Sequence, residues 1–512
     1  MEVYYKIEYK YILGSLSMTE LTYLGLKGYS ILKSGLDLSD QLFIRDSLTV
    51  RPYIPNSPVK ADPFPVYRES PKKLYVPRYF GIKEFGDPET TKLVNYHPIN
   101  VPFNGNLRDY QINISNIFMK NINLFGGGGL LEIPCGRGKT VIALHILSRV
   151  KTKTLVVVHK GFLLNQWIER IQQFLPTAKV GKIQGQIIDI DGKDIVIGML
   201  QSLSMKEYPE SMFECFGLTI VDECHHISSE VFSRSLSRIV TKYTLGLSAT
   251  MNRKDGLTPV FKMFLGEIIY SEKRESTDDV IVKAIEFRTE DEEFNEVKTD
   301  YRGNPAYSTM ITKLCNYSFR SEYILDILEK ELEEYPEQQV MILAHNKALL
   351  VYLYKGIEFR RIGSVGYYIG GMKEKDLKMS ESKKIIIATY AMASEALDIK
   401  SLTTLILATP KTDITQAVGR ILRVKHARPM VIDIVDRHDI FKRQWNKRRI
   451  FYQKNKYNIL YTEDYKKGEW KTIEKRQGCK SKQGGQGGQG NIESKNNLNH
   501  ELLKISKCLI KL

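Results

Sequence analysis

The segment EIPCGRGKT, at residues 132–140, has the residue types and spacing of a loop that binds phosphate. Glycines let the backbone curl so that several N–H groups face one anion, and a following helix N-terminus adds partial positive charge. Lys139 can reach the β and γ phosphates of a nucleotide, and Thr140 can ligate Mg²⁺. The loop departs from GxxxxGK[ST] at Ile133, which stands where the first glycine is expected. The apolar stretch before it and the helical stretch after it still predict ATP binding, by Gly136, Arg137, Gly138, Lys139 and Thr140.

A second group of reactive side chains ends an apolar run in LTIVDECHH, residues 218–226. Ligands of parallel α/β sheets bind where the strands end, so carboxylates there face the ligand. Asp222 could hold Mg²⁺ through water, and Glu223 could orient and deprotonate an attacking water. His225 could link this motif to a neighbouring one, whereas we expect a structural role for His226. The simpler alternative is an acidic turn, although two adjacent carboxylates followed by Cys-His-His are unusual for a turn.

Residues 104–275 alternate apolar runs with helical patterns, which predicts a first parallel α/β domain. Near-continuous apolar runs are typical of strands that are buried on both faces. The strands expected here are 154–159, 194–200, 218–223 and 243–250.

The alternation resumes at residues 316–440 and predicts a second domain of the same kind. Its expected strands are 340–345, 365–370, 384–389, 404–409 and 429–436. The fold class is therefore α/β, with two tandem parallel-sheet domains, a small mixed N-terminal domain and a basic C-terminal tail. The remaining boundaries are an N-terminal accessory domain at 1–103, an insertion or linker at 276–315, a basic helical extension at 441–482 and a Gly/Gln-rich tail at 483–512.

The positive charge of the chain is concentrated at its C-terminal end. The formal net charge is +16, and residues 437–512 contain 19 Lys+Arg and 7 Asp+Glu, so this end holds +12 and the remainder +4. Such asymmetry suggests contact with a polyanion, although a solvated basic tail would have the same composition.

Other features exclude several classes of protein. No run of about 18 apolar residues is present, so we expect no membrane span, and the N-terminus lacks the apolar stretch of a secretory signal. The six cysteines form no CxxC pair, which favours a reduced, intracellular protein without a zinc site or disulfide framework.

The ordered motifs resemble those of superfamily 2 helicases, most closely the XPB-type and UvsW-type enzymes and the helicases of poxviruses and other large DNA viruses. The matching segments run through most of residues 107–436. They are LRDYQ (107–111), EIPCGRGKT, VVVHKGFLLNQW, DECH, LSAT (247–250), MNRKDG (251–256), IATYAMASEALDI and QAVGRILR (416–423). The resemblance implies two RecA-like domains of the P-loop NTPase class, and an ATP-dependent helicase or translocase with ATP and Mg²⁺ as cofactors.

Carried over to this chain, the resemblance gives roles to individual residues. Gln111 would read the adenine edge, with Arg108 or Tyr110 nearby. Arg420 and Arg423 would meet the γ-phosphate from the second domain. The residues that would couple ATP state to nucleic-acid grip are His225, Ser248, Thr250, Asp398 and Gln416. Ala396 stands where motif V of the family has glycine, and would be strained if that position needs a positive φ.

The expected nucleic-acid track crosses both domains, with Lys160, Thr389 and Ser394 contacting phosphates and little sequence preference. The segment 437–457 is basic and aromatic, which would suit phosphate contact and base stacking. Phe441, Trp445, Arg449 and Tyr452 recur at helical spacing, however, so we favour a helix that packs its rings on the second domain. Nucleic-acid contact and solvation remain equally open for its basic face.

The resemblance suggests viral-type transcription or repair, with DNA or RNA as partner, RNA polymerase or repair factors as further partners, and a monomer. A viral protein of this kind would be found in the virion, a cytoplasmic virus factory or the nucleus. The alternative function is a non-unwinding, ATP-driven clamp or remodeller of a polymerase complex. A more distant alternative is a nucleotide-binding protein without a nucleic-acid function. The N-terminal unit could sense distorted duplex, bind a partner, or serve as a structural brace.

Overall fold

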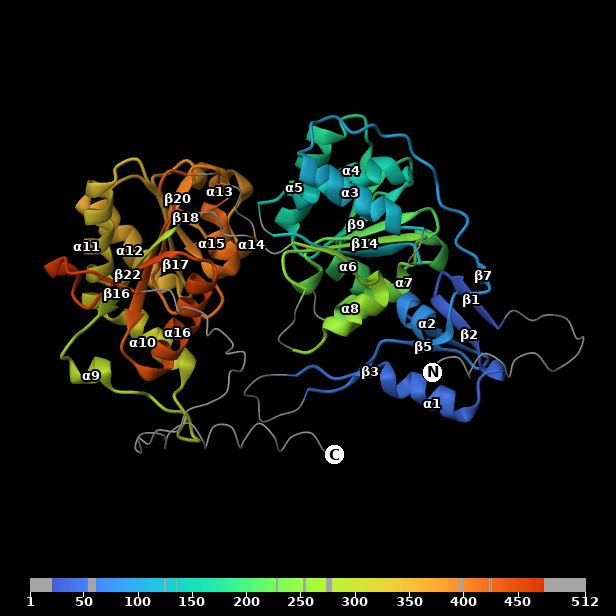
Figure 1. Cartoon of the computed structure of the whole chain (residues 1–512), viewed down its shortest axis with the longest axis horizontal. Helices are drawn as coiled ribbons and strands as arrows, with labels where there is room; N and C mark the ends of the chain where they lie inside the picture. The colour runs from blue at the N-terminus through green and yellow to red at the C-terminus, as the bar shows by residue number, and fades with distance from the viewer. Residues whose placement is uncertain are drawn as a thin grey trace, which may run out of the picture. The chain divides into compact units, whose positions relative to one another are not determined.

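The computed structural model describes residues 21–53, 61–123, 126–134, 136–226, 229–251, 255–272, 279–395, 399–422, 424 and 426–473 (Figure 1). Within this part of the chain, a small N-terminal sheet precedes two eight-stranded sheets. The tail predicted at 483–512 lies outside the described residues. No helix in the described part of the chain is both long and apolar enough to cross a membrane.

The N-terminal unit contains a mixed five-stranded sheet and short helices. Its sheet has the order β5-β6-β2-β1-β7, and all its pairs are antiparallel except β1 with β7. The elements of this unit are β1 (Thr22–Gly25), β2 (Gly28–Leu32), α1 (Leu38–Ser47), β3 (Thr49–Val50), β4 (Phe64–Pro65), β5 (Arg68–Glu69), β6 (Lys73–Val76), α2 (Arg78–Phe85) and β7 (Thr90–Thr91).

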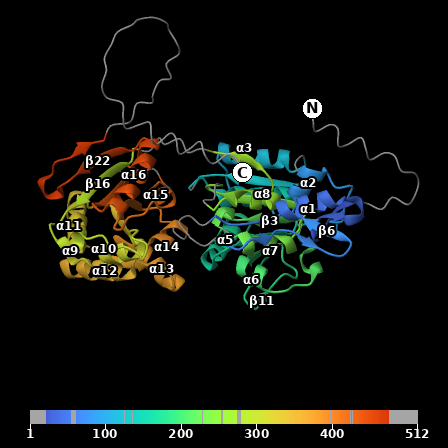
Figure 2. The ribbon, with the colours of Figure 1, turned by 90° about the horizontal axis from the view of Figure 1, so that it is seen from below.

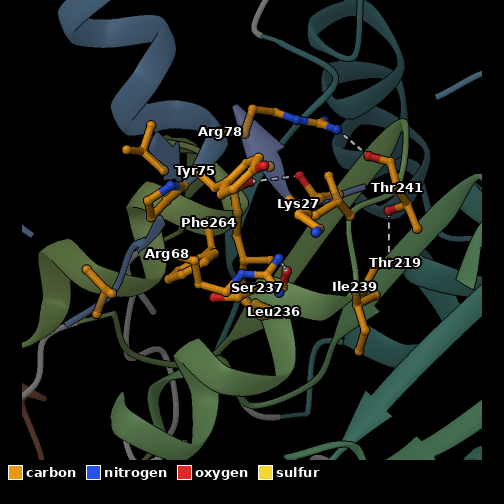
Figure 3. Close-up of a pocket in the computed structure, with 17 residues that line it drawn as sticks. Lys27, Arg68, Tyr75, Arg78, Thr219, Leu236, Ser237, Ile239, Thr241 and Phe264 are labelled. Carbon is orange, nitrogen blue, oxygen red and sulfur yellow. Dashed lines mark hydrogen bonds between the residues drawn. The ribbon is translucent and has the colours of Figure 1, made fainter. Parts of the chain in front are cut away.

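Two arginines join the N-terminal unit to the first large sheet (Figure 3). Arg78 is 5% exposed and donates hydrogen bonds to the carbonyl oxygens of Gly126, Thr241 and Lys242. Arg68 donates to the carbonyl oxygen of Ser237 over 2.5 Å, and both arginines line a crevice between the two parts. Burying an arginine is costly unless its donors are satisfied, so this contact is specific.

The first large sheet has the order β11-β10-β12-β9-β13-β14-β8-β15, and only β10 with β11 is antiparallel among the described pairs. Its strands confirm the expected apolar runs. They are β8 (Gly128–Glu132), β9 (Thr154–Val158), β10 (Val180–Gln184), β11 (Ile187–Ile188), β12 (Ile195–Met199), β13 (Leu218–Val221), β14 (Tyr243–Ser248) and β15 (Ile268–Ser271).

Helices cover both faces of this sheet, which explains why its strands are apolar throughout (Figure 1). One face packs against α3 (Asp109–Asn121), α4 (Lys139–Val150) and α5 (Gly161–Phe174). The other packs against α6 (Leu200–Met205), α7 (Ser229–Arg238) and α8 (Thr258–Leu265).

The second large sheet has the order β18-β19-β17-β20-β21-β16-β22-β23, again parallel except at its last pair. Its strands are β16 (Ile281–Phe287), β17 (Gln339–Ala344), β18 (Val365–Tyr368), β19 (Ile385–Thr389), β20 (Leu402–Leu407), β21 (Met430–Asp436), β22 (Asn458–Thr462) and β23 (Lys471–Thr472). The chain therefore has two RecA-like parallel-sheet lobes in tandem.

The helices of this lobe also form two layers (Figure 2). The side with α10 to α12 packs around one core, and the side with α14 to α16 packs around the other. The helices are α9 (Glu292–Asn295), α10 (Tyr307–Asn316), α11 (Ser318–Glu334), α12 (Lys347–Arg360), α13 (Glu374–Glu381), α14 (Tyr390–Glu395), α15 (Thr415–Ile421) and α16 (Asp439–Lys454).

The second sheet extends beyond the range 316–440 that the sequence predicts for the domain. Strand β16, from the expected linker at 276–315, lies between β21 and β22. Its apolar run is interrupted by Lys283 and Glu286, which are buried and paired with Glu331 and Arg288 respectively. Strands β22 and β23 likewise add sheet to the expected helical extension at 441–482.

Helix α16 packs its aromatic side chains on the second lobe, as its spacing predicts. Phe441, Trp445 and Tyr452 are all buried. The arginine on the buried face is Arg448, 1% exposed, and not the expected Arg449. A polar residue on the core side needs a partner, and Arg448 has one in Asp433.

Candidate ATP and nucleic-acid sites

Four adjacent parallel strands of the first sheet, β9, β13, β14 and β8, lead into the loops that carry the predicted chemistry. Parallel strands all end at the same edge, so these loops converge there. The phosphate-loop candidate follows β8, Asp222 and Glu223 follow β13, Thr250 lies just beyond β14, and Lys160 lies just beyond β9.

The loop before α4 has the backbone shape that its glycines predict. Gly136 and Gly138 have φ of 82° and 79°, in the left-handed region that favours glycine. Lys139 and Thr140 begin α4, so the free N–H groups of the first helical turn lie where a phosphate would bind. The Lys139 ammonium contacts Glu223 Oε1 at 2.5 Å. The lysine therefore reaches the carboxylate at the end of β13.

Arg137 is held on the side of this loop by two contacts. Its guanidinium stacks on the ring of Tyr110, 3.7 Å from the centroid, and its Nη2 lies 2.6 Å from Glu272 Oε1. The Tyr110 hydroxyl also donates to the Arg137 carbonyl oxygen over 3.3 Å. The segment that resembles the adenine-reading motif thus contacts the phosphate loop directly.

Gln111 connects the same two segments. Its Oε1 accepts the N–H of Arg108 at 3.0 Å, and its Nε2 donates to the carbonyl oxygen of Arg137 at 3.2 Å. The side chain is 7% exposed. In this structure the amide of Gln111 therefore holds the helix start of α3 to the phosphate loop.

Asp222 is buried, 5% exposed, and its carboxylate is held from two directions. The indole N–H of Trp167 donates to Oδ2 over 2.8 Å, and the Glu223 N–H donates to Oδ1 over 3.0 Å. Burial, followed by the charge of Glu223, raises the pKa of Asp222 to about 6, whereas Lys139 opposes the shift. Holding this carboxylate ionised at neutral pH is costly, and a bound cation would relieve that cost.

Trp167 contacts the candidate site although its sequence pattern did not single it out. It lies on α5 with no exposed surface, and its indole ring otherwise packs in the core of the first lobe. The only sequence signal was its place at the end of VVVHKGFLLNQW, one of the segments that carry the helicase resemblance. Its N–H fixes the orientation of the carboxylate that would face the metal.

Glu223 has a backbone conformation that is unusual for a side chain with a Cβ. Its φ is 47°, in the left-handed region, where a non-glycine residue costs on the order of 1–3 kcal/mol. Such strain persists only where the surroundings enforce it, and it is concentrated at functional sites. The turn places Oε1 on Lys139 and Oε2 within 3.3 Å of His225 Nδ1.

His225 links the end of β13 to the end of β14. Its Nδ1 lies 2.6 Å from Ser248 Oγ, and this Oγ in turn accepts the N–H of Thr250 at 3.0 Å. On its other side, His225 Nε2 lies 3.4 Å from Nε2 of Gln416, the second residue of α15. One path of polar contacts therefore runs from Lys139 through Glu223 and His225 to the LSAT segment.

In the second lobe, Arg420 lies on α15 and is 7% exposed. Its Nε donates to the carbonyl oxygen of Ala393 on α14 over 2.9 Å, so it joins the two helices. Arg423, Ala396 and Asp398 lie outside the described residues, as does the side chain of Ser394. Thr389 is the last residue of β19 and is partly buried. In the first lobe, Lys160 precedes α5, and burial lowers its pKa below the usual value.

The geometry suits a nucleotide phosphate better than a metal held by protein alone. Among the described residues, no group of three or more His, Cys, Asp and Glu side chains could hold a metal ion. Asp222 and Thr140 nevertheless offer the hard oxygen ligands that Mg²⁺ prefers, and nucleotide phosphates commonly complete such a site. The residues present therefore fit a Mg²⁺–nucleotide complex.

Comparison with known proteins agrees with this geometry. The family model described as type III restriction enzyme, res subunit, matches residues 104–253. The candidate ATP-dependent RNA helicase L396 of Acanthamoeba polyphaga mimivirus is 39% identical over 447 residues, which cover 84% of this chain and 85% of L396. The chain belongs to the superfamily 2 helicases of large DNA viruses. It is accordingly an ATP-dependent helicase by family, and ATP is its cofactor.

More distant relatives extend beyond viruses. The DNA 3'-5' translocase XPB2 of Sulfurisphaera tokodaii is 25% identical over 371 residues, covering 64% of this chain and 81% of that protein. Among solved structures, the crystal structure of T4 UvsW aligns with 84% of this chain and 96% of its own, at 18% identity and a TM-score of 0.33.

Proposed function

We propose that this helicase couples ATP hydrolysis to stepwise movement along DNA or RNA, with unwinding as the result. The observation that supports this best is the contact path from Lys139 through Glu223 and His225 to Ser248. A change at the phosphates can reach the LSAT segment through these side chains because each contacts the next. Coupling of this kind is what a motor requires beyond simple hydrolysis.

Each polar group at the site has a definite task in this proposal. Lys139 leaves Glu223 and binds the β and γ phosphates. Asp222 and Thr140 would hold Mg²⁺, which would neutralise phosphate charge. Glu223, freed from the lysine, takes a proton from the attacking water. Arg420 and Arg423 stabilise the charge that develops on the γ-phosphate, since arginine offers a rigid fork of donors and a permanent charge.

Trp167 provides a test of the metal site. Trp167→Phe removes the N–H that orients Asp222 while keeping an aromatic ring in the core. Loss of a hydrogen-bond donor that orients a metal ligand typically lowers metal affinity about 10–100-fold. We expect the Mg²⁺ concentration for half-maximal ATPase to rise by that factor. A Mg²⁺ titration of ATPase at fixed ATP measures it, with the unfolding temperature recorded without Mg²⁺ as a control for packing. An unchanged midpoint would refute the role of Trp167.

The nucleic-acid grip is proposed to involve Lys160 and Thr389, near the ends of β9 and β19, together with Ser394 of α14. The exposed face of α16, with Lys442, Arg443 and Lys447, adds positive charge that can contact phosphates. The rings of Phe441, Trp445 and Tyr452 are buried and therefore do not stack on bases. We propose a role in viral transcription or repair, with RNA polymerase or a repair factor as a further partner.

The experiment that tests this function is the ATPase rate with single- and double-stranded DNA and RNA. We expect stimulation by at least one of these polymers, and an apparent affinity that falls steeply with salt because phosphate contacts release counterions. The slope of log affinity against log salt is expected to be about −0.7 to −0.9 per phosphate contact.

Three outcomes would argue against the proposal. ATPase that no polymer stimulates, or an affinity that does not change with salt, would contradict a phosphate track. Stimulated ATPase without strand release from a fluorescent duplex would favour the clamp or remodeller instead.

A further inference from the structure

The segment Thr409–Lys411, between β20 and α15, is held at three successive carbonyl oxygens. The Tyr390 hydroxyl donates to the oxygen of Thr409 over 2.6 Å, and the Tyr307 hydroxyl donates to that of Pro410 over 3.2 Å. Arg448 Nη1 donates to that of Lys411 over 2.8 Å. The three donors come from α14, α10 and α16. Loop carbonyls usually bond to water, so three side-chain donors in a row make this segment unusually fixed.

The side chains of the segment are held as well. Thr409 Oγ1 accepts the N–H of His345 at 3.1 Å and lies 2.8 Å from His345 Nδ1. The Lys411 ammonium lies 4.7 Å from the centre of the Tyr390 ring. The segment is therefore fixed to β17, through the residue that follows it, as well as to three helices.

Arg448 is itself fixed by a buried carboxylate. Its Nε and Nη2 donate to the two oxygens of Asp433 over 2.7 and 2.8 Å, and the Tyr452 hydroxyl donates to Oδ2 over 2.9 Å. Arg448, Asp433 and Tyr452 are each no more than 1% exposed. Burying such a charge pair often stabilises a fold less than apolar packing would. Arg448 also contacts the Lys411 carbonyl oxygen, so the buried Arg448–Asp433 pair helps to fix the position of this segment.

The Thr409–Lys411 segment connects helix α14, which follows the proposed nucleic-acid contact Thr389, to helix α15. Tyr390 is the first residue of α14, directly after Thr389, which we propose as a nucleic-acid contact. Helix α15 begins four residues after Lys411 and carries Gln416 and Arg420. Arg420 also bonds back to Ala393 of α14. A shift of α14 therefore reaches α15 by two routes, the Tyr390–Thr409 bond and the Arg420–Ala393 bond.

We propose that Tyr307, Tyr390 and Arg448 are positioning residues that fix the Thr409–Lys411 segment and thereby set α15 and its Arg420. A change in nucleic-acid contact at the start of α14 then also changes the position of Arg420. This inference rests on the proposed function in one respect, that Arg420 acts on the γ-phosphate. The three residues touch neither ATP nor nucleic acid in this scheme; they act through α15.

Tyr390→Phe in the full chain tests the proposal, since it removes one hydroxyl and keeps the ring. Misplacement of a reacting group by about 1 Å can lower a rate about 10²-fold, so we expect nucleic-acid-stimulated kcat to fall about 10- to 100-fold. The KM for ATP should stay within about twofold, because the phosphate loop lies in the other lobe. Tyr323→Phe is the matched control, since its hydroxyl donates to the Glu286 carbonyl oxygen in the same lobe, away from the segment. It should leave kcat unchanged.

A double-mutant cycle with Arg420→Ala separates positioning from a general loss of structure. If Tyr390 acts through α15, Tyr390→Phe should add little to the loss in kcat that Arg420→Ala already causes. Multiplicative effects, or normal kcat in Tyr390→Phe, would overturn the positioning role and leave the proposed function intact. Normal kcat in Arg420→Ala alone would instead overturn the arginine role, and the positioning role with it. Should Tyr390→Phe fail to fold, Tyr307→Phe, whose side chain is partly exposed, enters the same cycle with the same outcomes.

Discussion

Glu223→Gln is expected to lower kcat for ATP hydrolysis about 10²–10⁴-fold, the usual contribution of a general base. Glutamine keeps the size and hydrogen-bonding shape of the side chain but cannot take the proton of the attacking water. ATP binding should be retained, and even strengthened, because Lys139 would no longer be held by a carboxylate 2.5 Å away. Steady-state hydrolysis at saturating ATP gives kcat, and fluorescent nucleotide binding gives the affinity.

The control for this variant is another carboxylate of the first lobe. Glu210→Gln removes an exposed partner of Lys27 and should hydrolyse ATP normally. Nucleic-acid binding should persist in both variants. Near-normal turnover in Glu223→Gln would show that the base is a different group, and a large loss of ATP affinity would show that the carboxylate is needed for binding rather than for chemistry.

Arg420→Ala is expected to lower kcat about 10³–10⁵-fold, as loss of an arginine that stabilises the transition state does in related nucleotide hydrolases. The side chain also bonds to Ala393, so part of the loss will come from α15 shifting against α14. Arg420→Lys keeps the charge but lacks the fork of donors, and should recover little of the rate.

Two measurements make this result specific. Arg302→Ala, at an exposed turn of the second lobe, should leave kcat unchanged and controls for loss of an arginine in the same lobe. The thermal unfolding temperature tells whether Arg420→Ala is folded. A folded Arg420→Ala protein with kcat within about tenfold of the parent would contradict the γ-phosphate role, since the expected loss is far larger.

The two lobes and the candidate chemical groups could be predicted from local patterns in the sequence. Buried parallel strands need apolar residues on both faces. Apolar runs such as 154–159 and 340–345 can therefore be recognised as strands from the local sequence. The phosphate loop is also local, because its shape depends on Gly136 and Gly138 within one turn of Lys139. The aromatic face of α16 follows from helical periodicity alone.

Features that depend on partners far away in the chain could not be predicted in this way and became visible in the fold. Strand β16 contains Lys283 and Glu286, and such charges indicate a strand interior only once Glu331 is known to pair with Lys283 and the Tyr461 hydroxyl with Glu286. The bond from Trp167 to Asp222 joins residues 55 positions apart, and the positive φ of Glu223 is enforced by its surroundings. The spacing of apolar residues along an element indicates which of its faces is buried. It does not indicate which residue, distant in the sequence, contacts that face. The residues that orient the proposed catalytic groups are therefore visible only in the fold. The proposed catalytic groups themselves could be predicted from the sequence.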